Sequence, residues 1–237
     1  MMFRARIALI SLAFAAISAH AQKPLSPYTA EYEVLRGGSV EGRATISLAE
    51  EGGGVWRLEE HTRGTQGLAA LAGVRVDETS RFRATPEGLN CLEHSYRQTG
   101  LRKRERQVDC TAEAIVSRDH RGEYRFAAQD GVIDRQAVGL AIALDLAAGR
   151  RGELDYAVID RESLETNRYQ VAGEETVAVP FGTLRALKVE RLRENSSRTT
   201  TMWFGTDQNL VPVRVRQNEG GGEGYELRLV SLKRQPG

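Results

Sequence analysis

Apolar and polar residues alternate along most of this chain. Between Tyr28 and Val34 every second residue is apolar, and the residues between them are polar. Successive side chains of a β-strand point to opposite faces, so this period of two predicts a strand with one buried face. The same reasoning predicts further strands over residues 40–48, 55–62, 74–84, 89–98, 102–110, 114–118, 124–127, 153–159, 165–171, 174–179, 184–192, 199–204, 211–217 and 225–232. Turns rich in Gly and Pro separate many of them, which favours a meandering antiparallel sheet or a barrel.

One segment departs from this period. Asp134 precedes a stretch rich in Ala and Leu over residues 135–148, and Gly149 follows it. An Asp side chain can accept hydrogen bonds from the first free amides of a helix, and Gly is common just past its end. We therefore predict a helix over 135–148 that is apolar nearly all round, and hence buried against the concave face of the sheet. A weaker apolar stretch over 68–74 is expected to be a short helix or an apolar loop tip.

Residues 1–21 have the composition of a secretory signal peptide. Two arginines precede an apolar run over 7–17, and Ala-His-Ala at 19–21 forms a small-x-small cleavage site. The run is shorter than the roughly 20 residues that span a bilayer, and a buried N-terminal helix is the alternative. We predict cleavage after Ala21 and a periplasmic or secreted protein. We expect no transmembrane segment after cleavage, and one β-rich domain over 22–237, because no linker or low-complexity tract divides it.

The charge is nearly balanced, with 33 Lys and Arg against 32 Asp and Glu. A nucleic-acid-binding protein needs a basic surface to meet phosphate, so we expect no nucleic-acid partner. The basic run Arg-Lys-Arg-Glu-Arg over 102–106 is interpreted as a solvated hairpin rim rather than as a binding patch.

Cys91 and Cys110 are the two cysteines of the chain. In an exported protein such a pair favours a disulfide. If the flanking strands fold back symmetrically about Gly100–Leu101, the two residues face each other with Cβ atoms about 4.5–5.5 Å apart, near the reach of a disulfide. The alternative is two free buried thiols. A catalytic dithiol is not expected, because the Cys-x-x-Cys spacing is missing.

Common catalytic patterns are missing from the sequence. It contains no Gly-x-Ser-x-Gly elbow, no phosphate-binding loop and no dinucleotide fingerprint. His61, His94 and His120 lie on separate predicted elements and are interpreted as surface or structural residues. Glu59 and His61 share a strand face, and a two-ligand metal site there is the less favoured interpretation. We therefore expect no catalytic residue, no metal and no cofactor.

Three stretches of the chain resemble a known family. They are DGVIDRQAVGLAIALDLAAGRR, YQVAGEETVAVPFGTLRALKVER and TTTMWFGTDQNLVPVRVRQ. They are similar to the domain-of-unknown-function 3108 (DUF3108) family of exported bacterial proteins, and the resemblance extends over about residues 28–232. It implies an exported β-rich domain without an established activity, and it implies no catalytic residues. A looser analogy, to the half-barrels of periplasmic lipoprotein carriers, concerns the fold alone.

Together these patterns predict a mainly β fold: a curved antiparallel sheet or incomplete barrel around one buried helix. If its mouth is incomplete, the concave side can hold an apolar ligand. The candidate pocket residues are Trp56, Leu68, Leu71, Leu144, Phe181, Trp203 and Phe204. Core packing is the alternative role for the aromatic ones.

Three functional hypotheses follow from this fold. The first is a non-enzymatic module that binds an apolar or amphipathic envelope ligand, such as a lipid or a lipoprotein acyl chain. The second is a structural or interaction protein that meets an envelope protein. The third is a hydrolase with an unrecognised site, which requires His and acidic side chains to converge in one pocket.

Overall fold

The computed structural model describes residues 25–100, 102–194, 196–220 and 224–235. The predicted signal peptide and its cleavage site lie outside these residues. Fifteen strands of the described chain form one sheet, in the order β8-β7-β6-β5-β4-β3-β2-β1-β15-β14-β13-β12-β11-β10-β9. Their bounds are β1 Tyr28–Arg36, β2 Ser39–Gly52, β3 Val55–Gly64, β4 Arg75–Thr85, β5 Gly88–Thr99, β6 Arg104–Cys110, β7 Ala114–Asp119, β8 Gly122–Ala127, β9 Val132–Asp134, β10 Glu153–Asp160, β11 Ser163–Val179, β12 Gly182–Leu192, β13 Thr199–Gly205, β14 Pro212–Asn218 and β15 Tyr225–Arg234.

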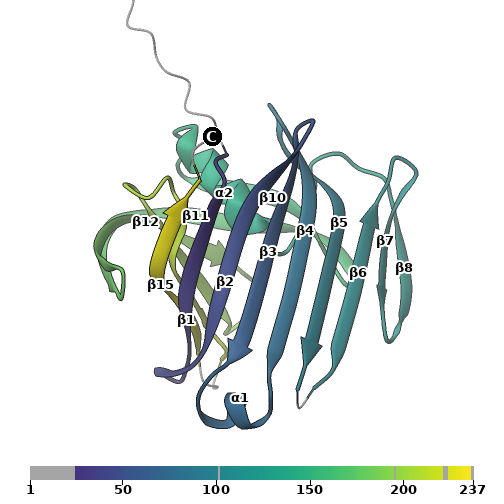
Figure 1. Cartoon of the computed structure of the whole chain (residues 1–237). Coiled ribbons are helices and arrows are strands. Elements are labelled where there is room, and N and C mark those ends of the chain that lie inside the picture. Colours follow the sequence, from purple (N-terminus) through teal and green to yellow (C-terminus); the bar gives the residue numbers. More distant parts are fainter. Residues whose placement is uncertain (1–24, 101, 195, 221–223, 236–237) are drawn as a thin grey trace, which may run out of the picture.

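The sheet curves over on itself without closing. Its neighbouring strands are antiparallel, apart from the parallel pair β9 and β10. β9, at one end of the strand order, contacts β5, so β6, β7 and β8 extend past this contact. Figure 1 shows β1–β8 as a broad wall, and α1 and α2 at opposite ends of the molecule. The predicted curved antiparallel sheet, or incomplete barrel, is confirmed.

The buried helix is α2, Val138–Ala147, and it begins three residues later than the predicted 135–148. Asp134 is the last residue of β9. Its carboxylate accepts hydrogen bonds from the backbone amides of the residues two and three positions further on, at 2.9 and 3.1 Å. It therefore caps the turn that leads into α2, whereas the helix N-cap itself, Ala137, has no side-chain cap bond. Gly149 has φ +80° and follows the helix end, as predicted.

Two strand predictions need correction. Residues 165–171 and 174–179 belong to one strand, β11, with a bulge between Val171 and Gly173. Gly173 has φ +116°, a backbone conformation that Gly adopts at no steric cost, and a bulge interrupts the period of two without ending the strand. The short strand β9 was not predicted. Its three residues are all buried, so they show no alternation.

A second helix and a second core complete the fold. α1, Gly67–Leu71, confirms the short-helix alternative for the apolar stretch after β3. The main hydrophobic core contains α2 and the inner face of the sheet. A smaller core lies between β5–β7 and β9–β10, and its buried members are Cys91, Val108, Ile115, Val132 and Ile159.

Cys91 and Cys110 form a disulfide with their Cα atoms 5.8 Å apart, which confirms the prediction. The ladder between β5 and β6 pairs Glu93 with Asp109, a register that alone would place Cys110 opposite Leu92. A β-bulge corrects this offset, because adjacent residues of β4 pair with Glu93 and Cys91 and skip Leu92. The bulge turns Cys91 toward Cys110.

Candidate functional site

The concave side of the sheet encloses a cavity of about 1890 Å³ that extends from α2 to α1. This volume exceeds the roughly 300–1,000 Å³ that is usual for pockets that bind drug-sized molecules. Inward-facing positions of the strands form its wall, and one side of α2 lies across it. The chemistry of the wall changes along its length.

The part of the cavity under α2, here called the apolar end, is formed by aliphatic and aromatic side chains. They include Tyr32, Ile46, Leu48, Leu58, Leu140, Leu144, Leu187, Met202 and Leu227. The hydroxyl of Tyr32 donates a 2.8 Å hydrogen bond to the carbonyl oxygen of Pro212, so the ring is buried without an unpaired polar atom. Burial raises the pKa of Tyr32 well above its ordinary value, and nearby Tyr28 and Glu60 act in the same direction.

Halfway along the cavity the wall becomes polar. Glu60 of β3, Glu78 of β4 and Arg135, which precedes α2, all line it. Burial, together with repulsion from Glu78, raises the pKa of Glu60 from 4.5 to about 6, against the opposing effects of Thr62 and Arg135. Burial also acts to raise the pKa of Glu78, but its hydrogen bond from His94 and the charge of Arg135 outweigh burial and lower it.

The end of the cavity near α1, here called the arginine mouth, is rich in guanidinium groups. Its arginines are Arg36, Arg63, Arg102, Arg104, Arg191, Arg193 and Arg198. Over the whole cavity, the described lining residues include ten arginines and five carboxylates, an excess of five positive charges. The complete chain has 33 basic and 32 acidic residues, so positive charge is concentrated in this cavity.

The arginine mouth was not predicted, although part of it is recognisable in the sequence. Leu187, Val189, Arg191 and Arg193 lie at every second position along and just beyond β12, so this face is apolar at first and basic at its end. The run over 102–106, interpreted as a solvated rim, contributes two exposed arginines to the mouth as well.

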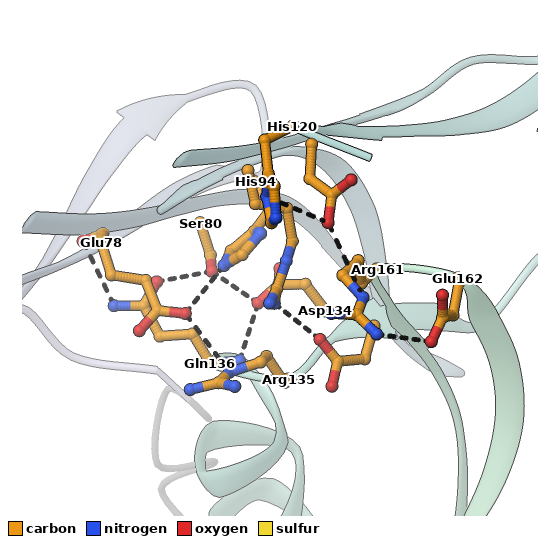
Figure 2. Close-up of polar contacts among 12 residues, drawn as sticks. Glu78, Ser80, His94, His120, Asp134, Arg135, Gln136, Arg161 and Glu162 are labelled. Carbon is orange, nitrogen blue, oxygen red and sulfur yellow. Dashed lines mark hydrogen bonds and ion pairs between the residues drawn. The ribbon is translucent and has the colours of Figure 1, made fainter. Parts of the chain in front are cut away.

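A cluster of mostly buried polar side chains joins β9 to β4 and β5. This seam cluster consists of Glu78, Ser80, His94, Asp134 and Gln136 (Figure 2). The Ser80 hydroxyl lies 2.7 Å from both Asp134 Oδ1 and Gln136 Oε1 and shares its proton between them. His94 Nε2 lies 2.9 Å from Glu78 Oε1, and Arg135 Nε lies 3.6 Å from the same oxygen. Because the pKa of Glu78 is lowered and its carboxylate is ionised, His94 donates through Nε2.

The seam cluster contains the residue types of a hydrolase but not the hydrogen bonds of one. A nucleophilic serine needs a base that accepts its proton, and the base needs an acid that orients it. Here the proton of Ser80 goes to Asp134 and Gln136, while His94 is bonded to Glu78. Ser80, His94 and Asp134 are almost completely buried, and the arrangement suits a link between β4, β5 and β9.

The predicted pocket residues lie in several different environments. Leu68, on α1, and Leu144, on α2, line the cavity. Trp56 is on the inner face of β3, two residues from Leu58, and is packed in the main core. Phe204 is fully buried in the same core.

Of the remaining three predicted pocket residues, Leu71 and Phe181 are exposed, whereas Trp203 is buried and packs in the main core. Leu71 is 86% exposed on α1, and Phe181 is exposed in the turn between β11 and β12. Trp203 follows the cavity-lining Met202, so its ring points to the opposite face of the sheet. There its Nε1 donates a hydrogen bond to Glu175, and the guanidinium of Arg214 lies 5.0 Å from the ring centroid.

The other two histidines lie on the surface. His61 Nδ1 is 2.7 Å from Asp77 Oδ1, and His120 Nδ1 is 3.9 Å from Asp119 Oδ2. Within the described ranges, no group of three or more His, Cys, Asp and Glu side chains is arranged to hold a metal ion. None of the described helices has the length and apolarity needed to cross a membrane.

Comparison with known proteins identifies a family and a fold. A family model described as "Protein of unknown function (DUF3108)" matches residues 27–230, which confirms the resemblance of the sequence motifs. No protein of curated function matches the sequence.

Two solved structures are similar to this one. The first is a β-barrel-like protein of the domain of unknown function DUF1849 from Brucella abortus. It aligns over 90% of this chain and 99% of its own, with 10% identity and a TM-score of 0.57, and it supports the fold alone. The second is a putative lipoprotein from Parabacteroides distasonis, with 14% identity, coverage of 89% and 96% of the two chains, and a TM-score of 0.32.

Proposed function

The chain belongs to the DUF3108 family, and we propose that it is a non-enzymatic module that binds an amphipathic molecule of the cell envelope. The observation that carries this proposal is the lengthwise division of the cavity. Its wall is mainly apolar under α2, where Arg151 and Arg234 also line it, and cationic at the arginine mouth. A molecule with an apolar chain and a polar end matches both parts at once.

The apolar end favours the chain of such a ligand. Burial of a methylene group stabilises binding by about 0.8 kcal/mol, so a lipid or a lipoprotein acyl chain gains affinity with each group it places under α2. The strands around this end are held by the main core and by the seam cluster, so the cavity is formed before the ligand arrives. The polar end of the ligand then lies among the arginines.

Export supports an envelope ligand. The disulfide Cys91–Cys110 is consistent with an oxidising compartment outside the cytoplasm. Together with the signal peptide expected from the sequence, it supports a periplasmic or secreted location.

An interaction role is the second candidate, because α1 presents two leucines to solvent. Leu68 and Leu71 are 76% and 86% exposed beside the arginine mouth. Exposed apolar side chains grouped on one element favour contact with a protein or membrane surface. In the binding module, the same leucines are placed to meet the surface from which a ligand is taken. A hydrolytic role has weaker support, since Ser80 does not share its proton with His94.

Titration with N-phenyl-1-naphthylamine tests the proposal. This uncharged probe fluoresces when it enters an apolar site, so its signal is independent of the arginines. Saturable binding that is displaced by monooleoylglycerol is the expected result. A purified, folded protein that gives no saturable signal with the probe would contradict the binding role.

A further inference from the structure

Arg191 and Arg193 lie next to each other on the inner face at the arginine mouth. Arg191 is near the end of β12, and Arg193 follows the strand. Both line the cavity, together with Asn167 and Tyr169 of β11 and Thr200 of β13. The two guanidinium groups therefore project into the space that leads to the apolar end.

Neutral acceptors hold these two arginines in place. Arg191 Nη2 donates a hydrogen bond to Asn167 Oδ1. Arg193 Nη1 donates to Thr200 Oγ1 at 3.1 Å and to the carbonyl oxygen of Arg198 at 3.4 Å. Within the described part of the chain, neither Arg191 nor Arg193 has a carboxylate at ion-pair distance, and the buried Nε of Arg191 has no hydrogen-bond partner.

Among the described residues, the positive charge at Arg191 and Arg193 is therefore only partly compensated, with Glu219 acting on Arg193 from beyond ion-pair distance. Arg198 has a counter-ion, since its Nε lies 3.2 Å from Glu219 Oε1. Burial, with repulsion from Arg191 and Arg198, lowers the pKa of Arg193 below its ordinary value to about 10, against the opposing effects of Tyr169 and Glu219. When guanidinium groups lie close together without a paired carboxylate, an anion can accept hydrogen bonds from their free N–H donors and neutralise their positive charge.

The type of cation indicates the type of anion. All ten basic residues of the described cavity lining are arginines. A guanidinium group is a planar fork of donors that binds the oxygens of phosphate or carboxylate in pairs. A phosphate monoester carries a charge of about −1.5 to −2 at neutral pH, which compensates two guanidinium groups better than a single carboxylate does.

We propose that Arg191 and Arg193 form a subsite that binds the phosphate group of the amphipathic ligand, with its chain directed toward α2. The inference rests on the proposed binding function and specifies the ligand class as a phosphate-bearing amphiphile. Asn167 and Thr200 position the two guanidinium groups through the hydrogen bonds they accept.

Two lipids that differ only in the phosphate test the subsite. Oleoyl lysophosphatidic acid and monooleoylglycerol have the same chain and glycerol, and calorimetric titration below their critical micelle concentrations gives both affinities. The variant is Arg191→Gln with Arg193→Gln. The matched control is Arg168→Gln with Arg185→Gln, which removes the same charge from two exposed positions of β11 and β12 that do not line the cavity.

The wild type is expected to bind lysophosphatidic acid at least about tenfold more tightly than monooleoylglycerol. In the Arg191/Arg193 variant this preference disappears and the affinity for monooleoylglycerol stays the same, whereas the control keeps the preference. Thermal unfolding of the variant without ligand is expected to be unchanged or shifted upward, because like charges are removed.

Three results would overturn the subsite. One is a preference that survives in the variant or is lost equally in the control. Another is inorganic phosphate binding to the wild type as tightly as lysophosphatidic acid, which would indicate a site for a free anion. The third is tight monooleoylglycerol binding without any preference for the phosphate, which removes the subsite but leaves the proposed function. If neither lipid binds, the proposed function fails as well.

Discussion

Ser80 Oγ donates a 2.7 Å hydrogen bond to Asp134 Oδ1, and both side chains are fully buried although they are 54 residues apart. The bond joins β4, in the broad wall, to β9, at the end of the strand order. A buried carboxylate requires hydrogen-bond donors, and Asp134 also accepts hydrogen bonds from two backbone amides just after β9. This contact therefore holds the curved sheet in the shape that encloses the cavity.

The first prediction concerns the stability of this link. Ser80→Ala removes one donor from a buried carboxylate and is expected to lower the free energy of unfolding by about 1–3 kcal/mol. Ser95→Ala, at an exposed position of the neighbouring strand β5, is expected to change it by less than about 0.5 kcal/mol. Urea unfolding of both variants measures the difference. Equal stability of the two variants would refute a structural role for the Ser80–Asp134 bond.

The second prediction concerns the pH dependence of stability. The pKa of Glu60 is about 6 in the folded chain and 4.5 in its ordinary state, so the folded protein binds this proton more tightly. Its contribution to stability is fully present below pH 4.5 and is lost as the pH rises through 6. Glu60→Gln keeps the polar shape without the charge, so it is expected to stabilise the protein at pH 7 by about 1–2 kcal/mol. Glu59→Gln, one residue earlier and on the opposite face of the strand, is the matched control.

Urea unfolding from pH 4 to pH 8 tests the role of Glu60. Between pH 4.5 and 6 the wild type and Glu59→Gln are expected to lose the stability that Glu60→Gln retains. Parallel stability curves for wild type and Glu60→Gln over this interval would show that Glu60 does not titrate as described.

The third prediction concerns the disulfide. Cys91 and Cys110 are 19 residues apart in the sequence, and their crosslink restricts the unfolded chain. Its reduction is expected to lower stability by about 3 kcal/mol, which corresponds to roughly 6–12 °C in Tm for a domain of this size. Calorimetry with and without dithiothreitol measures the change, and Cys91→Ala with Cys110→Ala should reproduce it without reductant. An unchanged Tm after complete reduction would contradict the prediction.

The fourth prediction concerns Gly139 on α2, which lines the cavity. Within the described structure and outside its own helix, the nearest atom to a Cβ at this position would be Pro212 Cγ, at 3.9 Å. Gly139→Phe therefore has room to enter the cavity, and it is expected to weaken binding of N-phenyl-1-naphthylamine roughly tenfold by occupying space in the apolar end. Gly139→Ala is the control: it favours the helix by about 0.5–1 kcal/mol and leaves the cavity open.

The fluorescence titration and thermal unfolding of the two Gly139 variants are compared directly. Retained probe affinity in a folded Gly139→Phe protein would place the binding site elsewhere.

The period of two predicted the long strands because their inner faces meet one core. The β1 segment from Tyr28 to Val34 is such a case, because buried residues alternate with more exposed ones as far as Val34. The same rule failed where alternation is locally lost. β9 is three buried residues that pair in parallel with β10, and β11 contains a bulge at its centre. Asp134 was correctly identified as a cap, but the turn that it caps delays the helix to Val138.

The site was harder to predict because its parts are distant in the sequence. The arginine mouth combines residues from Arg36 to Arg198, and only the curvature of the sheet brings them around one opening. Trp203 takes the alternative role of core packing: it is buried, and its ring lies on the face of the sheet opposite the cavity, beside Glu175 and Arg214. A strand whose inner face changes from apolar to basic, as from Val189 to Arg193, is a better signal than the aromatic residues were.

Native mass spectrometry shows whether the cavity holds an amphipathic molecule. The protein is purified without detergent from its own cells, alongside Gly139→Phe produced in the same way. The wild type is expected to carry an added mass that is released on denaturation, is identified as a phosphate-bearing lipid and is depleted in the variant. A wild-type protein that is folded and carries no bound molecule, or one that carries the same mass as Gly139→Phe, would contradict the proposed function.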